Sequence, residues 1–116
     1  MASKVTFQLK HYNPSVGAEI KKTRPAVIVN DDSLGILPLK IIVPITEWKE
    51  RYSVAPWMIR IEPTIENGLD KVSAADAFQV RSIDQTRIVR CLGHLSEPNM
   101  QEISRALALV LSIKIP

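Results

Sequence analysis

The sequence predicts one small, mainly antiparallel β domain that is completed by a single C-terminal helix. With 116 residues, the chain has room for one domain and one core. Short stretches of alternating apolar and polar residues recur between turn-forming residues, and the one long segment with helical spacing comes last. This order favours an antiparallel β-barrel or sheet with a helix against it, and other small α+β folds remain open at this point.

The expected strands follow one another closely along the chain. Most are predicted from alternation, and the second from a short apolar run that is rich in β-branched residues. The third carries Pro38 and Pro44 near its ends, and these prolines bound or bend it. The residue ranges of the expected strands are 5–10, 26–29, 36–45, 57–62, 74–80 and 87–92.

The closing segment has the start signal and the periodicity of an amphipathic helix. Ser96 is the expected N-cap, and Pro98 suits the first helical turn. Met100, Ile103 and Leu107 then recur at helical spacing. We expect this apolar stripe to cover the sheet or to take part in a dimer contact.

Composition bounds the class of protein. The chain is 46% hydrophobic and 23% charged, which is typical of a globular domain and not of a disordered chain. A single cysteine, Cys91, excludes an internal disulfide, and the N-terminus carries no secretory signal, so we expect a cytoplasmic protein. The two histidines, His11 and His94, lack companions at metal-ligand spacing, so no metal and no cofactor is expected.

A basic cluster lies before the second expected strand. Lys21, Lys22 and Arg24 stand beside Glu19 in a chain of net charge +3. Pro25 lacks a backbone donor and biases Arg24 toward an extended conformation, so its guanidinium is expected at the mouth of the strand. Such a cluster suits a phosphate. The alternatives are a solvated loop, or an ion pair between Arg24 and Glu19 or Asp31.

Several short motifs occur in one order along most of the chain. They are Gly17-x-Glu19, Thr23-Arg24-Pro25-Ala26-Val27, Val43-Pro44-Ile45-Thr46, Gly68-Leu69, Gln79-Val80-Arg81-Ser82-Ile83-Asp84 and Leu92-Gly93-His94-Leu95-Ser96. This ordered set resembles the MazF/PemK toxins, small ribonucleases of toxin–antitoxin modules. The resemblance implies one SH3-like small barrel (MazF/CcdB/Kid-like) over residues 1–116, with a C-terminal amphipathic helix and a two-fold symmetric homodimer.

The resemblance also implies an activity and a partner. Members of the family are metal-independent endoribonucleases that cut single-stranded RNA at a short sequence, leaving a 2′,3′-cyclic phosphate and a 5′-hydroxyl. Arg24 matches a catalytic arginine of the family, and Thr46 matches its second catalytic residue. Without the resemblance, a threonine at the end of a strand would be interpreted as a turn residue that satisfies backbone groups. Glu19 is expected to act as general base or to orient Arg24. The implied partner is an antitoxin whose acidic, disordered tail covers the basic site.

The expected RNA contacts come from three further side chains. Lys22 supplies a cation, and Trp48 lies in a polar, aromatic-rich loop over 47–57 where unpaired bases could stack. Trp57 is interpreted instead as an anchor of the fold. Gln79 either reads a base edge or satisfies the neighbours of its strand.

Some members of the family use a histidine in the first loop and an aspartate before the later glutamine. The matching positions here hold Ala18 and Phe78, so that acid–base assignment does not carry over. Asp76 is near but in another register, and strand alternation places it on the same face as Phe78.

Two other functions fit the same sequence. One is a toxin of this fold that cuts no RNA and binds a protein target such as gyrase. The other is a non-catalytic RNA-binding barrel, for which binding falls steeply with salt and no cleaved product forms.

Overall fold

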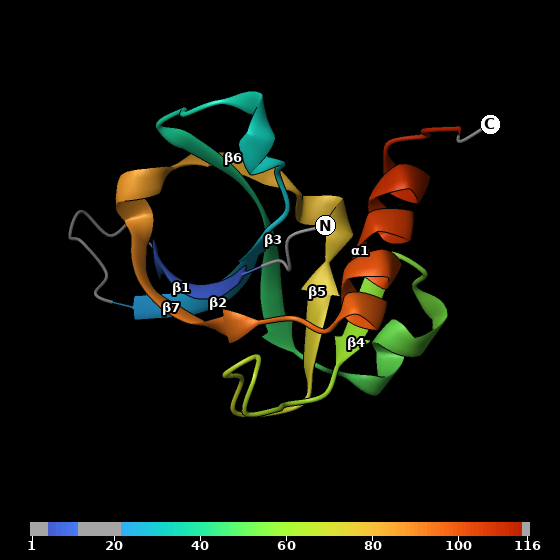
Figure 1. Cartoon of the computed structure of the whole chain (residues 1–116). Helices are drawn as coiled ribbons and strands as arrows, with labels where there is room; N and C mark the ends of the chain where they lie inside the picture. Colours follow the sequence, from blue (N-terminus) through green and yellow to red (C-terminus); the bar gives the residue numbers. More distant parts are fainter. Residues whose placement is uncertain (1–4, 12–21, 115–116) are drawn as a thin grey trace, which may run out of the picture.

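The computed structural model describes residues 5–11 and 22–114. These form antiparallel strands, short 3-10 helices and one α-helix (Figure 1). The strands are β1 (Val5–His11), β2 (Lys22–Ile28), β3 (Leu39–Glu47), β4 (Met58–Ile61), β5 (Ser73–Asp76), β6 (Arg81–Asp84) and β7 (Ile88–His94). The helices are η2 (Asp32–Leu34), η3 (Glu50–Val54), η4 (Ala77–Gln79), η5 (Gln85–Arg87) and α1 (Glu97–Val110).

The strands form one curled sheet. Its order is β4-β5-β3-β2-β1-β7, with β6 also paired to β3 (Figure 1). All of these pairs are antiparallel. Within the described residues β6 and β7 follow each other but share no ladder, so the curl stays open along that line. The structure therefore confirms a mainly β fold with a C-terminal helix, in which the sheet is not closed into a complete barrel.

Strand β3 holds the architecture together because it belongs to two ladders on one side. Its first half pairs with β6, from Leu39 to Ile42, and its second half pairs with β5, from Ile45 to Glu47. On its other side it pairs with β2 only as far as Pro44, opposite Ala26. Proline cannot donate to a ladder, so the sheet opens beside it.

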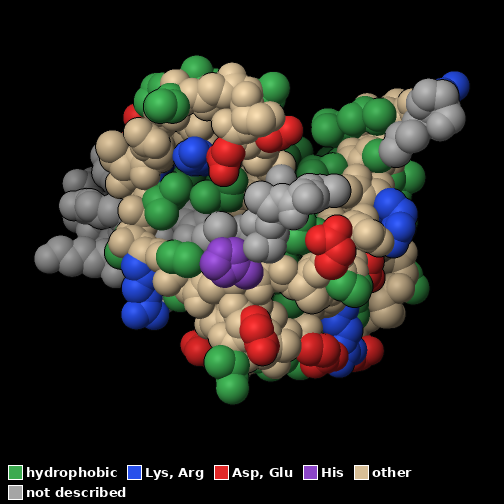
Figure 2. Space-filling model, viewed as in Figure 1, with side chains coloured by type: hydrophobic (Ala, Val, Ile, Leu, Met, Phe, Trp, Pro, Cys, Tyr) green, Lys and Arg blue, Asp and Glu red, His purple; other side chains and the backbone are tan. Residues whose placement is uncertain are grey.

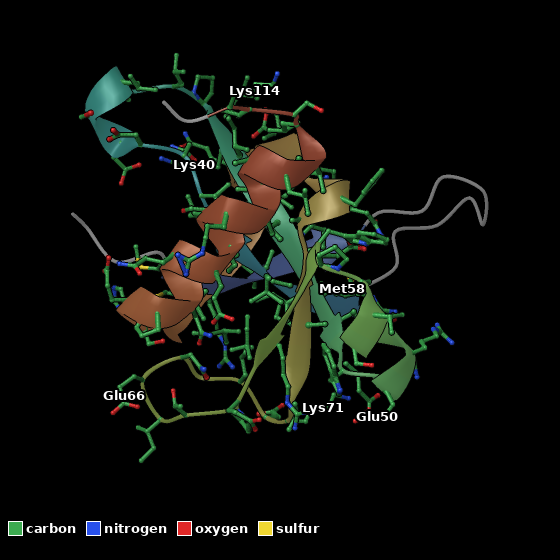
Figure 3. The ribbon with its side chains drawn as sticks, turned by 90° about the vertical axis from the view of Figure 1, so that its right-hand side faces the viewer. Lys40, Glu50, Met58, Glu66, Lys71 and Lys114 are labelled. Atoms are coloured by element: carbon green, nitrogen blue, oxygen red, sulfur yellow. The ribbon has the colours of Figure 1, made fainter. Side chains whose placement is uncertain are left out.

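Helix α1 covers one face of the sheet and completes the core (Figure 3). The Ser96 hydroxyl accepts a hydrogen bond from the Asn99 backbone N–H, which satisfies one of the free donors of the first turn. Met100 and Ile103 are buried in one cluster with Val27, Ile45 and other strand residues. The predicted N-cap and apolar stripe are confirmed. Among the described residues, no helix has the length and apolar character to cross a membrane.

Several element boundaries differ from the sequence prediction, and three of the differences shape the site. The segment 74–80 is not one strand, because Asp76 accepts a hydrogen bond from the Phe78 N–H and starts η4. β2 begins at Lys22 instead of 26, since β1 pairs with it along its whole length. β3 begins after Pro38, where the chain leaves the loop that contains η2.

Candidate active site

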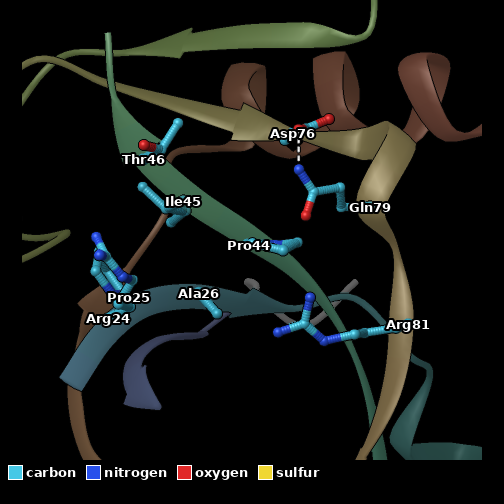
Figure 4. Close-up of a pocket in the computed structure, with 9 residues that line it drawn as sticks. All are labelled: Arg24, Pro25, Ala26, Pro44, Ile45, Thr46, Asp76, Gln79 and Arg81. Atoms are coloured by element: carbon cyan, nitrogen blue, oxygen red, sulfur yellow. Dashed lines mark hydrogen bonds between the residues drawn. The ribbon is translucent and has the colours of Figure 1, made fainter. Parts of the chain in front are cut away.

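Two strands separate at the edge of the β2–β3 ladder and create a cavity there. The ladder ends where Ala26 faces Pro44. Extended by two residues, the same register brings Arg24 of β2 opposite Thr46 of β3. Both side chains line this cavity, which has a volume of about 370 Å³. The fold thus brings together a guanidinium and a hydroxyl that are distant in the sequence (Figure 4).

The opposite wall comes from an irregularity in the strand next to β3. From Ile42 to Ile45, β3 advances three residues, while its partner runs from Arg81 back to Ala75, twice as many. The extra residues are the three of η4. Asp76 at the end of β5, Gln79 in η4 and Arg81 at the start of β6 therefore line the cavity from the side opposite to Arg24 (Figure 4).

The site is polar and carries two cations and one carboxylate. The ion pairs of the described side chains join Lys40 to Asp32, Arg60 to Glu62 and Lys71 to Glu47, so neither Arg24 nor Arg81 is neutralised by one of them. Gln79 Nε2 donates to Asp76 Oδ2 at 2.8 Å. Guanidinium groups keep their charge and match phosphate oxygens with two parallel donors. The cavity therefore suits a phosphate group.

A second cavity of about 480 Å³ adjoins the first. Thr46, Asp76 and Gln79 line both cavities and form their shared wall. The rest of the second cavity is mostly apolar and aromatic, and its lining residues include Arg51, Tyr52, Val54, Ala55, Trp57 and Met58. A cationic cavity and a largely apolar cavity thus lie side by side.

The structure brings some of the residues expected at the site together and leaves others elsewhere. Arg24, Thr46 and Gln79 line one cavity. The sequence predicted Arg24 at the mouth of the strand. It lies inside β2 instead, because β2 starts two residues earlier, at Lys22. Trp48 lines neither cavity: its Nε1–H donates to Glu50, and the Arg60 guanidinium lies 5.4 Å from its ring centroid.

Two expected site residues cannot be placed in the same way. Glu19 lies outside the described residues, and for Lys22 the structure describes only the backbone, which pairs with His11. The ion pair between Arg24 and Asp31 that the sequence left open is not found among the described residues.

Sequence reasoning missed Asp76 and Arg81. Alternation placed Asp76 beside Phe78 on one face, but that argument fails because a 3-10 turn starts at Asp76. Asp76 lines both cavities, whereas Phe78 is exposed and contacts the edge of the Trp57 ring. The pattern Asp-x-x-Gln over 76–79 is the signal that could have revealed the turn, since an aspartate readily caps such a turn.

The fold and the site together define a small β domain with a cationic cleft at the edge of its central strand. Comparison with known proteins agrees with the resemblance read from the motifs. A family model described as "PemK-like, MazF-like toxin of type II toxin-antitoxin system" matches residues 6–111. The chain belongs to this family.

Individual relatives cover most of the chain. A "Probable endoribonuclease MazF" of Mycolicibacterium smegmatis is 34% identical over 98 residues, which are 84% of this chain and 87% of that protein. "Endoribonuclease MazF9" of Mycobacterium tuberculosis is 29% identical over 107 residues, which are 87% of this chain and 88% of the relative.

Solved structures share the fold. "Mycobacterium tuberculosis toxin MazF-mt6" superposes with a TM-score of 0.72 at 15% identity, over 96% of this chain and 98% of that chain. A MazE–MazF structure from Deinococcus radiodurans gives 0.68 at 18% identity, over 97% of this chain and 96% of the other. At these identities the similarity establishes the architecture.

Proposed function

We propose that this protein is a metal-independent endoribonuclease that cleaves single-stranded RNA at a short sequence and leaves a 2′,3′-cyclic phosphate and a 5′-hydroxyl. The observation that carries the proposal is the placement of Arg24 and Thr46 on facing strands of one cavity. Relatives that cover most of the chain are named endoribonucleases, which supports it.

The reaction needs a clamp on the phosphate and two proton transfers. The ribose 2′-oxygen forms the new bond to phosphorus, the bond to the leaving 5′-oxygen breaks, and a proton moves from the first oxygen to the second. Arg24 binds the phosphate oxygens and stabilises the charge that builds up on them, and Thr46 donates a hydrogen bond to one of them. Arg81 adds a second cation from the opposite wall. DNA lacks the attacking hydroxyl and is not cut.

The remaining roles follow the family resemblance. Glu19 removes the 2′-hydroxyl proton or orients Arg24. Lys22 binds a backbone phosphate, and Trp48, outside the two cavities, stacks on a base. Gln79 contacts RNA from the shared wall of the two cavities. RNA in the cytoplasm is the substrate.

The direct test is incubation of the purified protein with a long RNA in the presence of EDTA, followed by mapping of the new ends. Cleavage at a recurring short sequence, with products that carry a 5′-hydroxyl, is the expected result. Intact RNA under these conditions, or cleavage only when a divalent metal is supplied, would contradict the proposal.

Thr46 offers a test of the hydroxyl. Replacing it with valine keeps the shape of a β-branched side chain but removes the donor, and we expect the cleavage rate to fall by about 10²-fold. Single-turnover cleavage of an RNA with one mapped site measures this. Thr46→Ser keeps the hydroxyl and should retain most of the rate. Equal rates for the wild-type protein and Thr46→Val would remove Thr46 from the chemistry.

The proposal includes a homodimer and an acidic antitoxin as partners. One related structure is named an endoribonuclease "in complex with its cognate antitoxin", and a disordered acidic tail complements the cationic cavity.

Exposed apolar side chains gather on the β2–β3 loop and at the C-terminal end of α1, and both places are green in Figure 2. We call this set the apolar rim, and its members are Leu34, Ile36, Leu37, Leu109, Leu111 and Ile113.

An apolar rim of this kind suits the interface of a dimer. Ile36 is fully exposed in the single chain, so Ile36→Asp should leave the fold intact and weaken dimerisation by at least about tenfold. Sedimentation equilibrium measures the effect against the monomer mass of 13.0 kDa. Val89→Asp, an equal change at an exposed position of β7, is the matched control. An unchanged dimer in Ile36→Asp would place the interface elsewhere.

A further inference from the structure

The second cavity is lined by aromatic rings and by polar side chains, and a nucleobase needs both kinds of contact. Its walls are contributed by η3, by the turn before β4 and by η4. It joins the cationic cavity through Thr46, Asp76 and Gln79, so a nucleotide with its phosphate near Arg24 has its base within reach of this space. The volume of about 480 Å³ falls in the range of small-ligand sites.

Two aromatic rings of this cavity are held by neighbours. The Trp57 ring meets Phe78 edge-on at a centroid distance of 5.7 Å, and the backbone oxygen of Trp57 accepts a hydrogen bond from Ala77. Tyr52 meets Trp48 edge-on at 5.8 Å. Rings fixed in this way present a stacking surface at little cost in side-chain entropy.

Two side chains of the polar wall, Asp76 and Gln79, present hydrogen-bond acceptors, whereas the Thr46 hydroxyl and the Arg51 guanidinium of the same cavity can donate. Asp76 Oδ1 accepts from the Phe78 N–H and Oδ2 accepts from Gln79 Nε2, which leaves further lone pairs on both carboxylate oxygens. Because the Gln79 amide nitrogen is turned to Asp76, its Oε1 is left as another acceptor. A base edge that faces Asp76 and Gln79 must offer donors.

Guanine offers two adjacent donors on one edge, N1–H and the exocyclic amine, which match the two oxygens of a carboxylate. Uracil offers one N–H between two carbonyl oxygens, which would face the acceptors of the wall. We propose that the second cavity is a guanine-selective nucleobase subsite, in which Asp76 and Gln79 determine specificity and the rings of Tyr52 and Trp57 stack on the base. The inference rests on the proposed function for the location of the phosphate.

Binding of nucleoside 3′,5′-bisphosphates tests the subsite without any cleavage. These compounds carry a phosphate on both sides of the ribose, so either polarity of the strand is represented. The indole N–H signal of Trp57, assigned with a Trp48→Phe variant, reports binding by NMR. We expect the guanosine compound to bind roughly ten- to hundredfold more tightly than the uridine compound, which is the discrimination that one bidentate pair provides.

Asp76→Asn is the decisive variant. Asparagine also caps short turns, so η4 is retained, but one acceptor oxygen becomes an amide donor. The affinity for the guanosine compound should fall to that for the uridine compound, whose own affinity stays unchanged. Asp84→Asn is the matched control, because Asp84 caps η5 in the same way and lines neither cavity.

Two results would overturn the subsite: equal affinities for the guanosine and uridine compounds in the wild-type protein, or an unchanged preference in Asp76→Asn. A purely structural role of Asp76 would lower all affinities together. Failure of the nuclease proposal is distinguishable, because a protein that prefers the guanosine compound but leaves RNA intact in EDTA keeps the subsite and loses the activity.

Discussion

Replacing Arg24 with alanine is expected to reduce RNA cleavage by at least about 10³-fold while the fold is retained. Arg24 is exposed in β2 and lines the cationic cavity, so its removal leaves no void in the core. The register of β2 and β3 places Arg24 opposite Thr46. Without its guanidinium, the negative charge that builds up on the phosphate in the transition state would lose its main partner. Single-turnover cleavage kinetics and circular dichroism together measure the two parts of this prediction.

Two comparisons make the Arg24 result specific. Arg24→Lys keeps the charge but loses the planar pair of donors, so it should recover only a small part of the rate. Arg90→Ala removes an exposed strand arginine that lines neither of the two joined cavities, and it should cleave like the wild-type protein. Wild-type cleavage by Arg24→Ala would exclude Arg24 from the mechanism.

Gly68→Ala is expected to produce a large loss of stability, on the order of 3 kcal/mol or more. Gly68 has a φ of +68°, and a Cβ built there would lie 2.2 Å from the backbone oxygen of Leu92. A hydrogen bond also ties this turn to β7, since the Glu66 oxygen accepts from the His94 N–H at 2.7 Å. A methyl group at Gly68 would push the 65–68 turn away from β7.

Urea denaturation measures this loss as a shift of the midpoint. Gly35→Ala is a useful control, because Gly35 also has a positive φ of +115° but a Cβ there would meet nothing within 4 Å. The control carries the backbone strain without the collision, so its cost should be clearly smaller. Equal midpoints for the two variants would show that the turn relaxes freely from β7.

The parts of the fold that local sequence signals determine were predictable. The strand predicted over 5–10 is β1, and the N-cap and apolar stripe predicted for the closing segment are found in α1, because these signals depend only on neighbours in the chain. The segment 74–84 was not predictable in the same way. Its division into β5, η4 and β6 depends on one carboxylate that caps a turn and on a partner strand that supplies two ladders.

The candidate site also has residues that the sequence predicted and residues that it did not. Arg24 and Thr46 were expected from motifs, and the register of β2 and β3 explains why they meet. Asp76 and Arg81 reach the cavity only because η4 inserts extra residues beside β3, an offset that alternation alone does not reveal. The expected roles of Trp48 and Trp57 depend on tertiary contacts as well: Trp57 lines the second cavity, and Trp48 packs against Arg60.

The aromatic lining of the second cavity and the proposed phosphate-binding pair, Arg24 and Thr46, lie on different parts of the fold. Tyr52 belongs to η3, a short helix that lies outside every ladder, whereas Arg24 and Thr46 are built into paired strands. Under the proposed function, insertions or replacements between β3 and β4 would remodel the aromatic part of the base subsite while Arg24 and Thr46 keep their positions. Retargeting of this domain, in nature or by engineering, has an obvious starting point at residues 48–57.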